Sequence, residues 1–569
     1  MNFTIKPLAW LICGALLLAL GGCDATELEE NLVNVNEPNP ESASLEFVFN
    51  GIQTEFPKFL GGFENGPNDD LAEGAGVFDR TNELMRYINM GGGNMYNNAF
   101  FGVDYDFIWR QAYAEVLPDV RAVKENAAGR GQTAVLGIAQ VYEAYTYLTL
   151  VDMFGDVPFA EALQGADNFS PAASPGSEVY AAMLDTLDAA IANLNDGVGA
   201  PSYDIIYGGD PSKWIKAANT LKMKAALNLR LVDASRARTI IDDVVGSGNF
   251  IQDMSDDLAY RYGTLRTNTN SRSRLYSRNY ETGATEYIGN SFMFDLLTDY
   301  SITDPRLRYY VYRQDLDATD EDFFTLSCQA LDAPDHFGDD QPFCTAAPEL
   351  GYWGRDHGDD DGIPPDDVKR TIVGVYPAGG AFDDDSGEGL ADDNGAGGAM
   401  GAGILPMMLS PFVDFMRAEA ALTLGTSDDA EARLLEGVRK SMMSVHAYSV
   451  SFGVTIPDTF SIAVDTNAVN TYLSEVEAAY DDADSDDARL NVIGREYYKA
   501  LWLNGLEAYN LYRRTGTPND LQPTRDPNGG TFPRTVLYPN VAVTLNSNIS
   551  NRDITNQVFW DTNPAGFID

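Results

Sequence analysis

Histidine and cysteine are scarce in this chain: three histidines and four cysteines occur among 569 residues. His336, His357 and His446 leave little room for a zinc site or a histidine base, and no HExxH pattern occurs. The acidic strings at 355–362 and 481–489 lack the spacing of an EF-hand loop. We therefore expect neither a metal site nor a catalytic residue, and we keep a bound Ca²⁺ ion as an alternative to solvated charge.

Long apolar runs are also missing, so no segment is predicted to cross a membrane as a helix. The longest run, residues 8–20, ends at Leu20-Gly21-Gly22-Cys23, which resembles a bacterial lipobox. We predict a lipoprotein signal peptide at 1–22, acylation of Cys23 and a lipidated tether at 23–45. An ordinary signal peptide cleaved nearby is the alternative, and in both cases the protein is exported. Acidic residues directly after Cys23 resemble the signal that sends some outer-membrane lipoproteins to the cell surface.

Basic residues are few: the chain has 38 lysines and arginines but 85 aspartates and glutamates, so its formal net charge is -47. Phosphate groups would be repelled at every approach, which argues against nucleic acid or anionic lipid as a partner. The membrane would be reached through the lipid anchor only.

Two cysteines remain once Cys13 leaves with the signal peptide and Cys23 carries the lipid. In an oxidising compartment we predict a disulfide between Cys328 and Cys344. Closing a loop of about 15 residues would stabilise the fold by roughly 3 kcal/mol on the chain-entropy model.

Amphipathic helices dominate the rest of the chain, and the best defined one is predicted at 209–233. Asp210 is a suitable N-cap, Pro211 suits the first helical position, and apolar residues recur every three to four positions from Trp214. Its lysines, including Lys224, are expected mostly on the other faces. The same spacing predicts helices from Tyr105 with a break or kink at Pro118, at 131–154, after Pro175, and at 412–424, 435–445, 469–480 and 490–512.

Helical periodicity fades between about 249 and 406, where glycine, aspartate, asparagine, tyrosine and proline accumulate. A loop-rich insertion of this length is usually functional. We predict a single, mainly α domain over 46–569 that contains this large loop-rich region. Its helix pairs have lengths compatible with tetratricopeptide-like units, but the consensus positions of that repeat are not kept in register.

Several local patterns follow one another along the chain: VDMFGDVPF (151–159), KWIKAANTLKMKAALNLR (213–230), DPRL (304–307), GRDHGDDDGIPPD (354–366), GVYPAGG (374–380), MRAEAAL (416–422) and EYYKALWLNGLEAYNLYRRTGTP (496–518). In this order they resemble the SusD/RagB family of outer-membrane nutrient-binding lipoproteins, in particular its SusD-like branch. The resemblance implies a mainly helical fold, in which tetratricopeptide-like helix pairs form a scaffold for a large loop-rich ligand-binding region. It also implies a protein that covers a SusC-like TonB-dependent barrel, captures oligosaccharides and performs no chemistry. A minority of relatives bind oligopeptides, which stays the alternative.

Most of these motif residues are expected to be architectural, so the ligand site must be sought elsewhere. A sugar has an apolar face and a polar rim, which suits aromatic rings beside amides and arginines. Two stretches, 85–101 and the loop-rich block, offer such sets. The candidate ligand-binding residues are Arg86, Tyr96, Asn97, Asn98, Phe101, Tyr276, Tyr280 and Trp353. The alternative is that these aromatic side chains pack the loops onto the helices.

Two other classes of protein remain as rivals. A lipid-anchored glycoside hydrolase needs two carboxylates at a controlled separation, but among 85 acidic residues some such pair is unavoidable and carries no weight. A scaffold protein that binds only other proteins would have no affinity for oligosaccharides or peptides. We expect a binding protein and not an enzyme.

Overall fold

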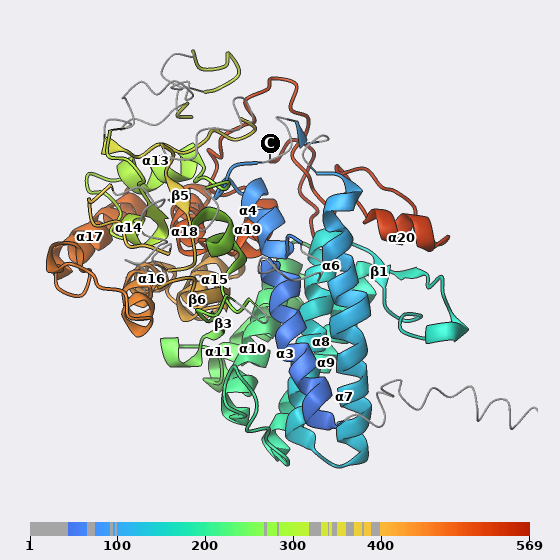
Figure 1. Ribbon diagram of the computed structural model, residues 1–569. Helices are drawn as coiled ribbons and strands as arrows, with labels where there is room; N and C mark the ends of the chain where they lie inside the picture. Colours follow the sequence, from blue (N-terminus) through green and yellow to red (C-terminus); the bar gives the residue numbers. More distant parts are fainter. Residues whose placement is uncertain are drawn as a thin grey trace, which may run out of the picture.

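The computed structural model describes residues 44–64, 74–90, 95–96, 100–266, 270–280, 284–317, 332–338, 341–343, 350–359, 369–377, 380–387 and 399–568 (Figure 1). Cys23, Cys328, Cys344, Asn97 and Asn98 lie outside these residues. Lipidation and the disulfide therefore stay predictions. Within the described ranges, no helix combines the length and the apolar character that a membrane span requires.

Long helices form the first half of the molecule, and neighbours along the chain pack on one another from α7 to α11. Figure 1 shows α3, α7, α8 and α9 side by side. The helices are α3 (Leu45–Gly61), α4 (Val77–Leu84), α6 (Asp106–Arg110), α7 (Leu117–Gly129), α8 (Thr133–Phe154), α9 (Gly176–Asp196), α10 (Pro211–Asn228) and α11 (Ala234–Ser247). Shorter turns are η1 (Gly102–Tyr105), η2 (Gln111–Val116), η3 (Gly165–Asp167), η4 (Leu229–Leu231) and η5 (Met254–Asp256).

Helix α10 begins where its sequence predicts. The Asp210 carboxylate accepts a hydrogen bond from the Ser212 amide at 2.9 Å, and Trp214 is fully buried. The expectation that the lysines keep to the outer faces is wrong for Lys224, which is 1% exposed. Its ammonium lies between two carboxylates of other helices, 2.8 Å from Asp152 and 3.1 Å from Glu507.

The predicted break or kink at Pro118 is not a break, because α6, η2 and α7 follow one another without an interruption. The turn η2 is π-helical, and the Leu117 amide bonds back to the Ala112 carbonyl. This wider turn carries the chain into α7, where Pro118 lies in the first turn and its missing N–H does least harm.

Helical structure returns after the loop-rich block with α15 (Ser410–Leu424), α16 (Ala430–Ser451), α17 (Thr466–Asp482), α18 (Asp486–Ala500), α19 (Gly505–Thr515) and α20 (Asn540–Leu545). The single helix predicted at 490–512 is wrong, since α18 ends at Ala500 and α19 starts at Gly505. Asn504 causes the break: its amide nitrogen donates to the Pro406 carbonyl at 2.8 Å, and its oxygen caps α19. Helix α19 ends at Gly516, whose φ of 70° is left-handed.

The loop-rich block holds short elements that periodicity did not predict: α12 (Arg274–Tyr280), α13 (Asn290–Thr298) and α14 (Leu307–Tyr310). Two antiparallel strand pairs in and beside this block join segments far apart in the chain: β3 (Leu258–Tyr262) with β6 (Gly403–Met408), and β4 (Val311–Tyr312) with β5 (Ile372–Val373). A further short antiparallel pair, β1 (Val157–Pro158) with β2 (Ala173–Ser174), lies between α8 and α9. The mainly α architecture with a loop-rich region is therefore confirmed.

The main hydrophobic core contains side chains from both helical blocks, and a buried polar cluster surrounds Asp152. The carboxylate of Asp152, in α8, accepts hydrogen bonds from Lys224 at 2.8 Å, Asn510 at 3.0 Å, the Trp560 indole at 3.1 Å and the Tyr180 hydroxyl. These partners come from α9, α10, α19 and the C-terminal segment. Asp152 thus ties four helices together, which gives this part of the VDMFGDVPF motif an architectural role.

Arg513 and Arg514 of the last helical motif are buried as well. Arg513 donates to the Asp152 carbonyl at 2.7 Å, and Arg514 forms a two-bond ion pair with Glu419 of α15 at 2.7 and 2.8 Å. Arg514 also donates to the Asn228 side-chain oxygen of α10 at 2.6 Å, so the bonds of Arg513 to α8 and of Arg514 to α10 join the two helical blocks.

Candidate ligand-binding site

The first predicted stretch is mostly interior. Arg86 is 1% exposed, and its guanidinium donates to the Gln522 carbonyl at 2.9 Å and to the Tyr96 hydroxyl at 3.0 Å. Tyr96 is 2% exposed and its hydroxyl lies 3.1 Å from Nε2 of His357. Phe101, in contrast, is 53% exposed.

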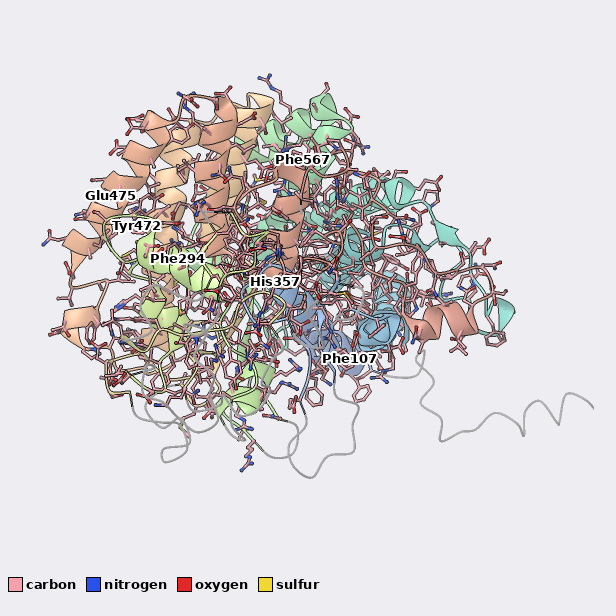
Figure 2. All side chains as sticks on the ribbon, turned by 90° about the horizontal axis from the view of Figure 1, so that it is seen from above. Phe107, Phe294, His357, Tyr472, Glu475 and Phe567 are labelled. Carbon is pink, nitrogen blue, oxygen red and sulfur yellow. The ribbon has the colours of Figure 1, made fainter. Side chains whose placement is uncertain are left out.

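His357 lies near the middle of the molecule in the view of Figure 2, and its backbone amide donates to the Gln522 side-chain oxygen at 2.7 Å. Burial, with the Arg86 charge nearby, holds the pKa of His357 well below its usual range. The ring is therefore neutral at physiological pH, and its Nε2 shares a hydrogen bond with the Tyr96 hydroxyl inside the fold.

The second predicted stretch is also covered. Tyr276 and Tyr280 stack on each other with centroids 5.2 Å apart and planes 6° apart, and each is 3% exposed. Trp353 is 2% exposed, and the Arg370 guanidinium lies 3.8 Å from the centre of its ring. The packing alternative accounts for these three rings, and a role in ligand contact stays a prediction for them.

The structure does bring the two stretches together. Ile88 bridges Ile288, Gly289 bridges Arg355, and Tyr96 meets His357. Loops far apart in the sequence thus share one region, as a binding face requires, although their predicted aromatic residues other than Phe101 are buried.

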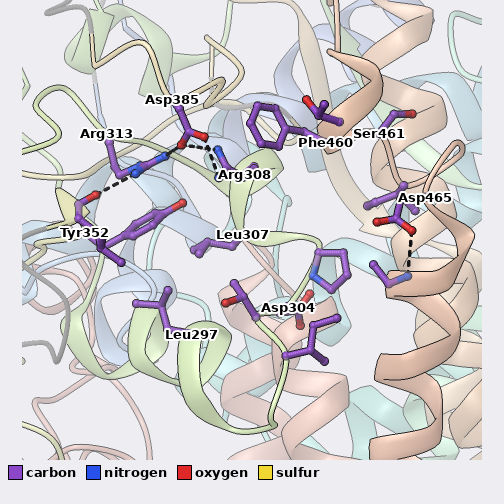
Figure 3. Close-up of a pocket in the computed structure, with 17 residues that line it drawn as sticks. Leu297, Asp304, Leu307, Arg308, Arg313, Tyr352, Asp385, Phe460, Ser461 and Asp465 are labelled. Atoms are coloured by element: carbon purple, nitrogen blue, oxygen red, sulfur yellow. Dashed lines mark hydrogen bonds and ion pairs between the residues drawn. The ribbon is translucent and has the colours of Figure 1, made fainter.

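An open pocket lies elsewhere in the loop-rich block, between α13, α14 and the loop that leads into α17 (Figure 3). Its volume is about 510 Å³, within the usual range for small-molecule sites. The walls combine an apolar surface with charged groups. The lining includes Leu297, Ile302, Thr303, Asp304, Pro305, Leu307, Arg308, Arg313, Leu350, Tyr352, Asp385, Thr459, Phe460, Ser461, Ile462, Asp465 and Ala468.

Two arginines converge on one carboxylate at the edge of this pocket (Figure 3). Arg308 donates to both oxygens of Asp385, at 2.8 and 3.2 Å, and Arg313 forms a further ion pair with it. Arg313 also holds the buried Asp383 through two bonds, at 2.8 and 2.9 Å. Burial alone would raise the pKa of Asp385, but hydrogen bonds from the two arginines hold it below its usual range. Asp385 is therefore ionised at neutral pH.

Each arginine also covers an aromatic ring. The Arg308 guanidinium lies 4.0 Å from the centre of the Phe460 ring, and that of Arg313 lies 4.3 Å from the Tyr352 ring. These stacks fix the direction of the guanidinium groups, so their N–H bonds are held in place before any ligand arrives.

The DPRL motif explains how Arg308 is positioned. Asp304 accepts from the Arg306 amide at 2.8 Å, and the buried Arg306 side chain binds Asp304 at 2.6 Å and Glu496 of α18 at 3.0 Å. This anchor sets the start of α14, which places Leu307 in the core and Arg308 on the pocket.

The pocket residues were not among those predicted from the sequence. Arg308, Arg313 and Asp385 lie in the loop-rich block, which is the region predicted to bind the ligand, but Phe460 and Asp465 come from the segment before α17. The DPRL motif is the sequence feature that could have pointed to the pocket, because a motif that anchors the start of a short helix also fixes the position of the next residue, here Arg308.

Comparisons with known proteins agree with this architecture. A family described as "Starch-binding associating with outer membrane" matches residues 79–327, and one described as "Susd and RagB outer membrane lipoprotein" matches residues 404–556. No curated protein matches the chain.

Solved structures share the fold over nearly the whole chain. A chitin-binding protein is 18% identical, with 92% of this chain and 100% of the other covered and a TM-score of 0.64. A SusD/RagB family protein from Bacteroides thetaiotaomicron is 20% identical, with 92% and 100% covered and a TM-score of 0.66. A SusD homolog from Bacteroides fragilis is 16% identical, with 91% and 99% covered and a TM-score of 0.63. With both family matches in chain order on this fold, the chain belongs to the SusD-like family of outer-membrane proteins.

Proposed function

We propose that this protein is a lipid-anchored lipoprotein of the outer membrane that captures oligosaccharides outside the cell and hands them to a SusC-like TonB-dependent barrel. The observation that carries the proposal is the pocket beside α14, where guanidinium and carboxylate groups surround an apolar wall. Family membership supports it, because SusD/RagB proteins bind nutrients and are not known as enzymes.

The chemistry of the pocket suits a sugar. A pyranose presents C–H groups on its faces and hydroxyl groups around its rim. Half-buried Leu297, Ile302 and Phe460 can contact the faces, while Arg308 and Asp385 can donate to and accept from the hydroxyls. The chitin-binding relative makes oligomers of N-acetylglucosamine a suitable first ligand to test.

The pocket is tested by measuring the affinity of purified protein for a panel of neutral oligosaccharides by calorimetry. Arg308→Ala and Phe460→Ala should each weaken binding roughly tenfold or more, since each removes a fixed contact with the ligand. Phe169→Ala is the matched control, because this ring is 78% exposed and lies on another cavity. Unchanged affinity in both pocket variants would move the site elsewhere.

The sequence-predicted residues are tested in the same assay. Phe101→Ala asks whether the exposed ring of the first stretch contacts the ligand, and Tyr96→Ala, Tyr280→Ala and Trp353→Ala ask the same of the buried rings. If these variants lose binding while keeping their thermal stability, the site extends to that stretch. Binding of a peptide panel in place of sugars would favour oligopeptides as the cargo.

The anchor and the barrel need a separate experiment in membranes. Wild-type protein should fractionate with the outer membrane and co-purify with a TonB-dependent barrel, and Cys23→Ser should release it. A soluble wild-type protein without a barrel would contradict the proposal. Release of new reducing ends from polysaccharides would revive the glycoside hydrolase.

A further inference from the structure

Two arginines and two aspartates lie close together at the edge of the pocket, so the positive and negative charges of this group are equal in number. Arg308 and Arg313 face Asp383 and Asp385, and both arginines contact Asp385. Asp385 therefore fills the space between two guanidinium groups, which is where a carboxylate or sulfate of a ligand would otherwise bind.

The two aspartates have different surroundings. Asp383 is 1% exposed and is also held by the Tyr352 hydroxyl at 3.2 Å, so it belongs to the framework. The Asp385 side chain is 43% exposed, and among the described residues the other carboxylate that pairs with the Arg308 guanidinium is that of Asp383, 3.9 Å away. Removing the charge of Asp385 would leave Arg308 facing the pocket with Asp383 as its remaining, more distant ionic partner.

We propose that Asp385 sets the charge preference of the pocket, so that it accepts uncharged, hydroxyl-rich sugars and rejects acidic ones. The inference rests on the proposed function, because it assumes that this pocket binds an oligosaccharide. Hydroxyl groups use the remaining N–H donors and carboxylate lone pairs without disturbing the ion pairs. An acidic sugar must displace Asp385, and it meets Asp465 on the same pocket and a chain of net charge -47.

Asp385→Asn tests the inference with little change of shape. The φ of Asp385 is 67°, a left-handed conformation that asparagine also tolerates. Asp384→Asn is the matched control: it removes the same charge from the adjacent residue, whose carboxylate accepts from the Ser386 amide at 3.1 Å and does not line the pocket. The probes are hexamers of N-acetylglucosamine, glucose and galacturonate, measured by calorimetry.

Wild-type protein and Asp384→Asn should bind a neutral hexamer and show no measurable affinity for the galacturonate hexamer. Asp385→Asn should bind the galacturonate hexamer with an affinity roughly tenfold or more above the detection limit that wild type does not reach, because two charge-assisted contacts become available. The gain should vanish in Asp385→Asn/Arg308→Gln and weaken in high salt.

The outcomes separate the inference from the function it rests on. If wild type binds galacturonate as well as neutral hexamers, or if Asp384→Asn gains as much as Asp385→Asn, the inference is overturned and the binding function stands. If Asp385→Asn folds with a wild-type melting temperature and gains nothing, the inference is again overturned. If wild type binds no oligosaccharide, the proposed function fails and the inference with it.

Discussion

Replacing Asp152 by asparagine tests the claim that one buried carboxylate holds the helical scaffold together. Asp152 is 0% exposed and receives hydrogen bonds from α9, α10, α19 and the C-terminal segment. Asparagine has nearly the same shape but only one acceptor oxygen, so it presents N–H groups to neighbours that are themselves donors. The Lys224 ammonium would keep only Glu507, at 3.1 Å.

The expected loss follows from the cost of a buried charge that loses its partner. Burial alone would lower the pKa of Lys224, but Asp152 and Glu507 raise it above its usual range, so the ammonium stays charged in the core. Removing one partner of such a pair costs about 3–5 kcal/mol. The urea m-value is about 1–3 kcal/mol/M for small proteins and grows with chain size, so the unfolding midpoint of this protein should fall by roughly 0.5–1 M.

Urea unfolding followed by circular dichroism measures this shift. Asp167→Asn is the control, because Asp167 is an exposed aspartate in η3 and its removal should change the midpoint little. Asp152→Asn/Lys224→Met should recover part of the loss, since it removes the buried charge along with its partner. A midpoint for Asp152→Asn within experimental error of wild type would refute the reasoning.

Three further predictions concern stability. Burial raises the pKa of Asp257 to about 7, so the folded state binds this proton more tightly than the unfolded state does, and the resulting stabilisation is lost as pH rises from about 4 to 7. Between pH 5 and 8, the free energy of unfolding of wild type should therefore fall by roughly 3 kcal/mol relative to that of Asp257→Asn, as urea midpoints would show. Gly505→Ala should destabilise the protein by about 3 kcal/mol, because the new Cβ would lie 2.3 Å from the backbone nitrogen of Asn82. Gly246 lies in α11 and a Cβ there would meet no atom within 4 Å, so Gly246→Ala should stabilise the protein by about 0.5–1 kcal/mol in the same urea unfolding experiment. Intact-mass analysis should find Cys328 and Cys344 lighter by two hydrogens without reductant, and two free thiols would contradict the disulfide.

Helix boundaries were predictable where the signal is local. The N-cap Asp210 with Pro211 marks the start of α10, and Gly516 marks the end of α19. The break between α18 and α19 was not, because Leu501, Trp502 and Leu503 continue the apolar pattern. It depends on Asn504 bonding to carbonyls at 406 and 407, about a hundred residues earlier in the chain.

Of the candidate pocket, the sequence predicted only the loop-rich region that supplies part of its wall. Tyr276 and Tyr280 lie four residues apart in the sequence, but this spacing does not say that the two rings stack in the interior of the protein. The pocket joins Arg308 to Phe460, which are separated by about 150 residues, and its charges are balanced by contacts between loops. Such contacts are set by the packed scaffold and leave no periodic trace in the sequence.

Asp152 and Asp385 both form ion pairs, but the pair of Asp152 stabilises the scaffold and that of Asp385 lies at the candidate pocket. Both are carboxylates held by cationic side chains, but Asp152 is fully enclosed while the Asp385 side chain is 43% exposed. Exposed ion pairs contribute about 0–1 kcal/mol, so Asp385→Asn should melt close to wild type while Asp152→Asn should not. The charge at position 385 can therefore change without unfolding the scaffold. This tolerance is expected of a residue that selects a ligand. Equal destabilisation by both substitutions would show that Asp385 belongs to the scaffold as well.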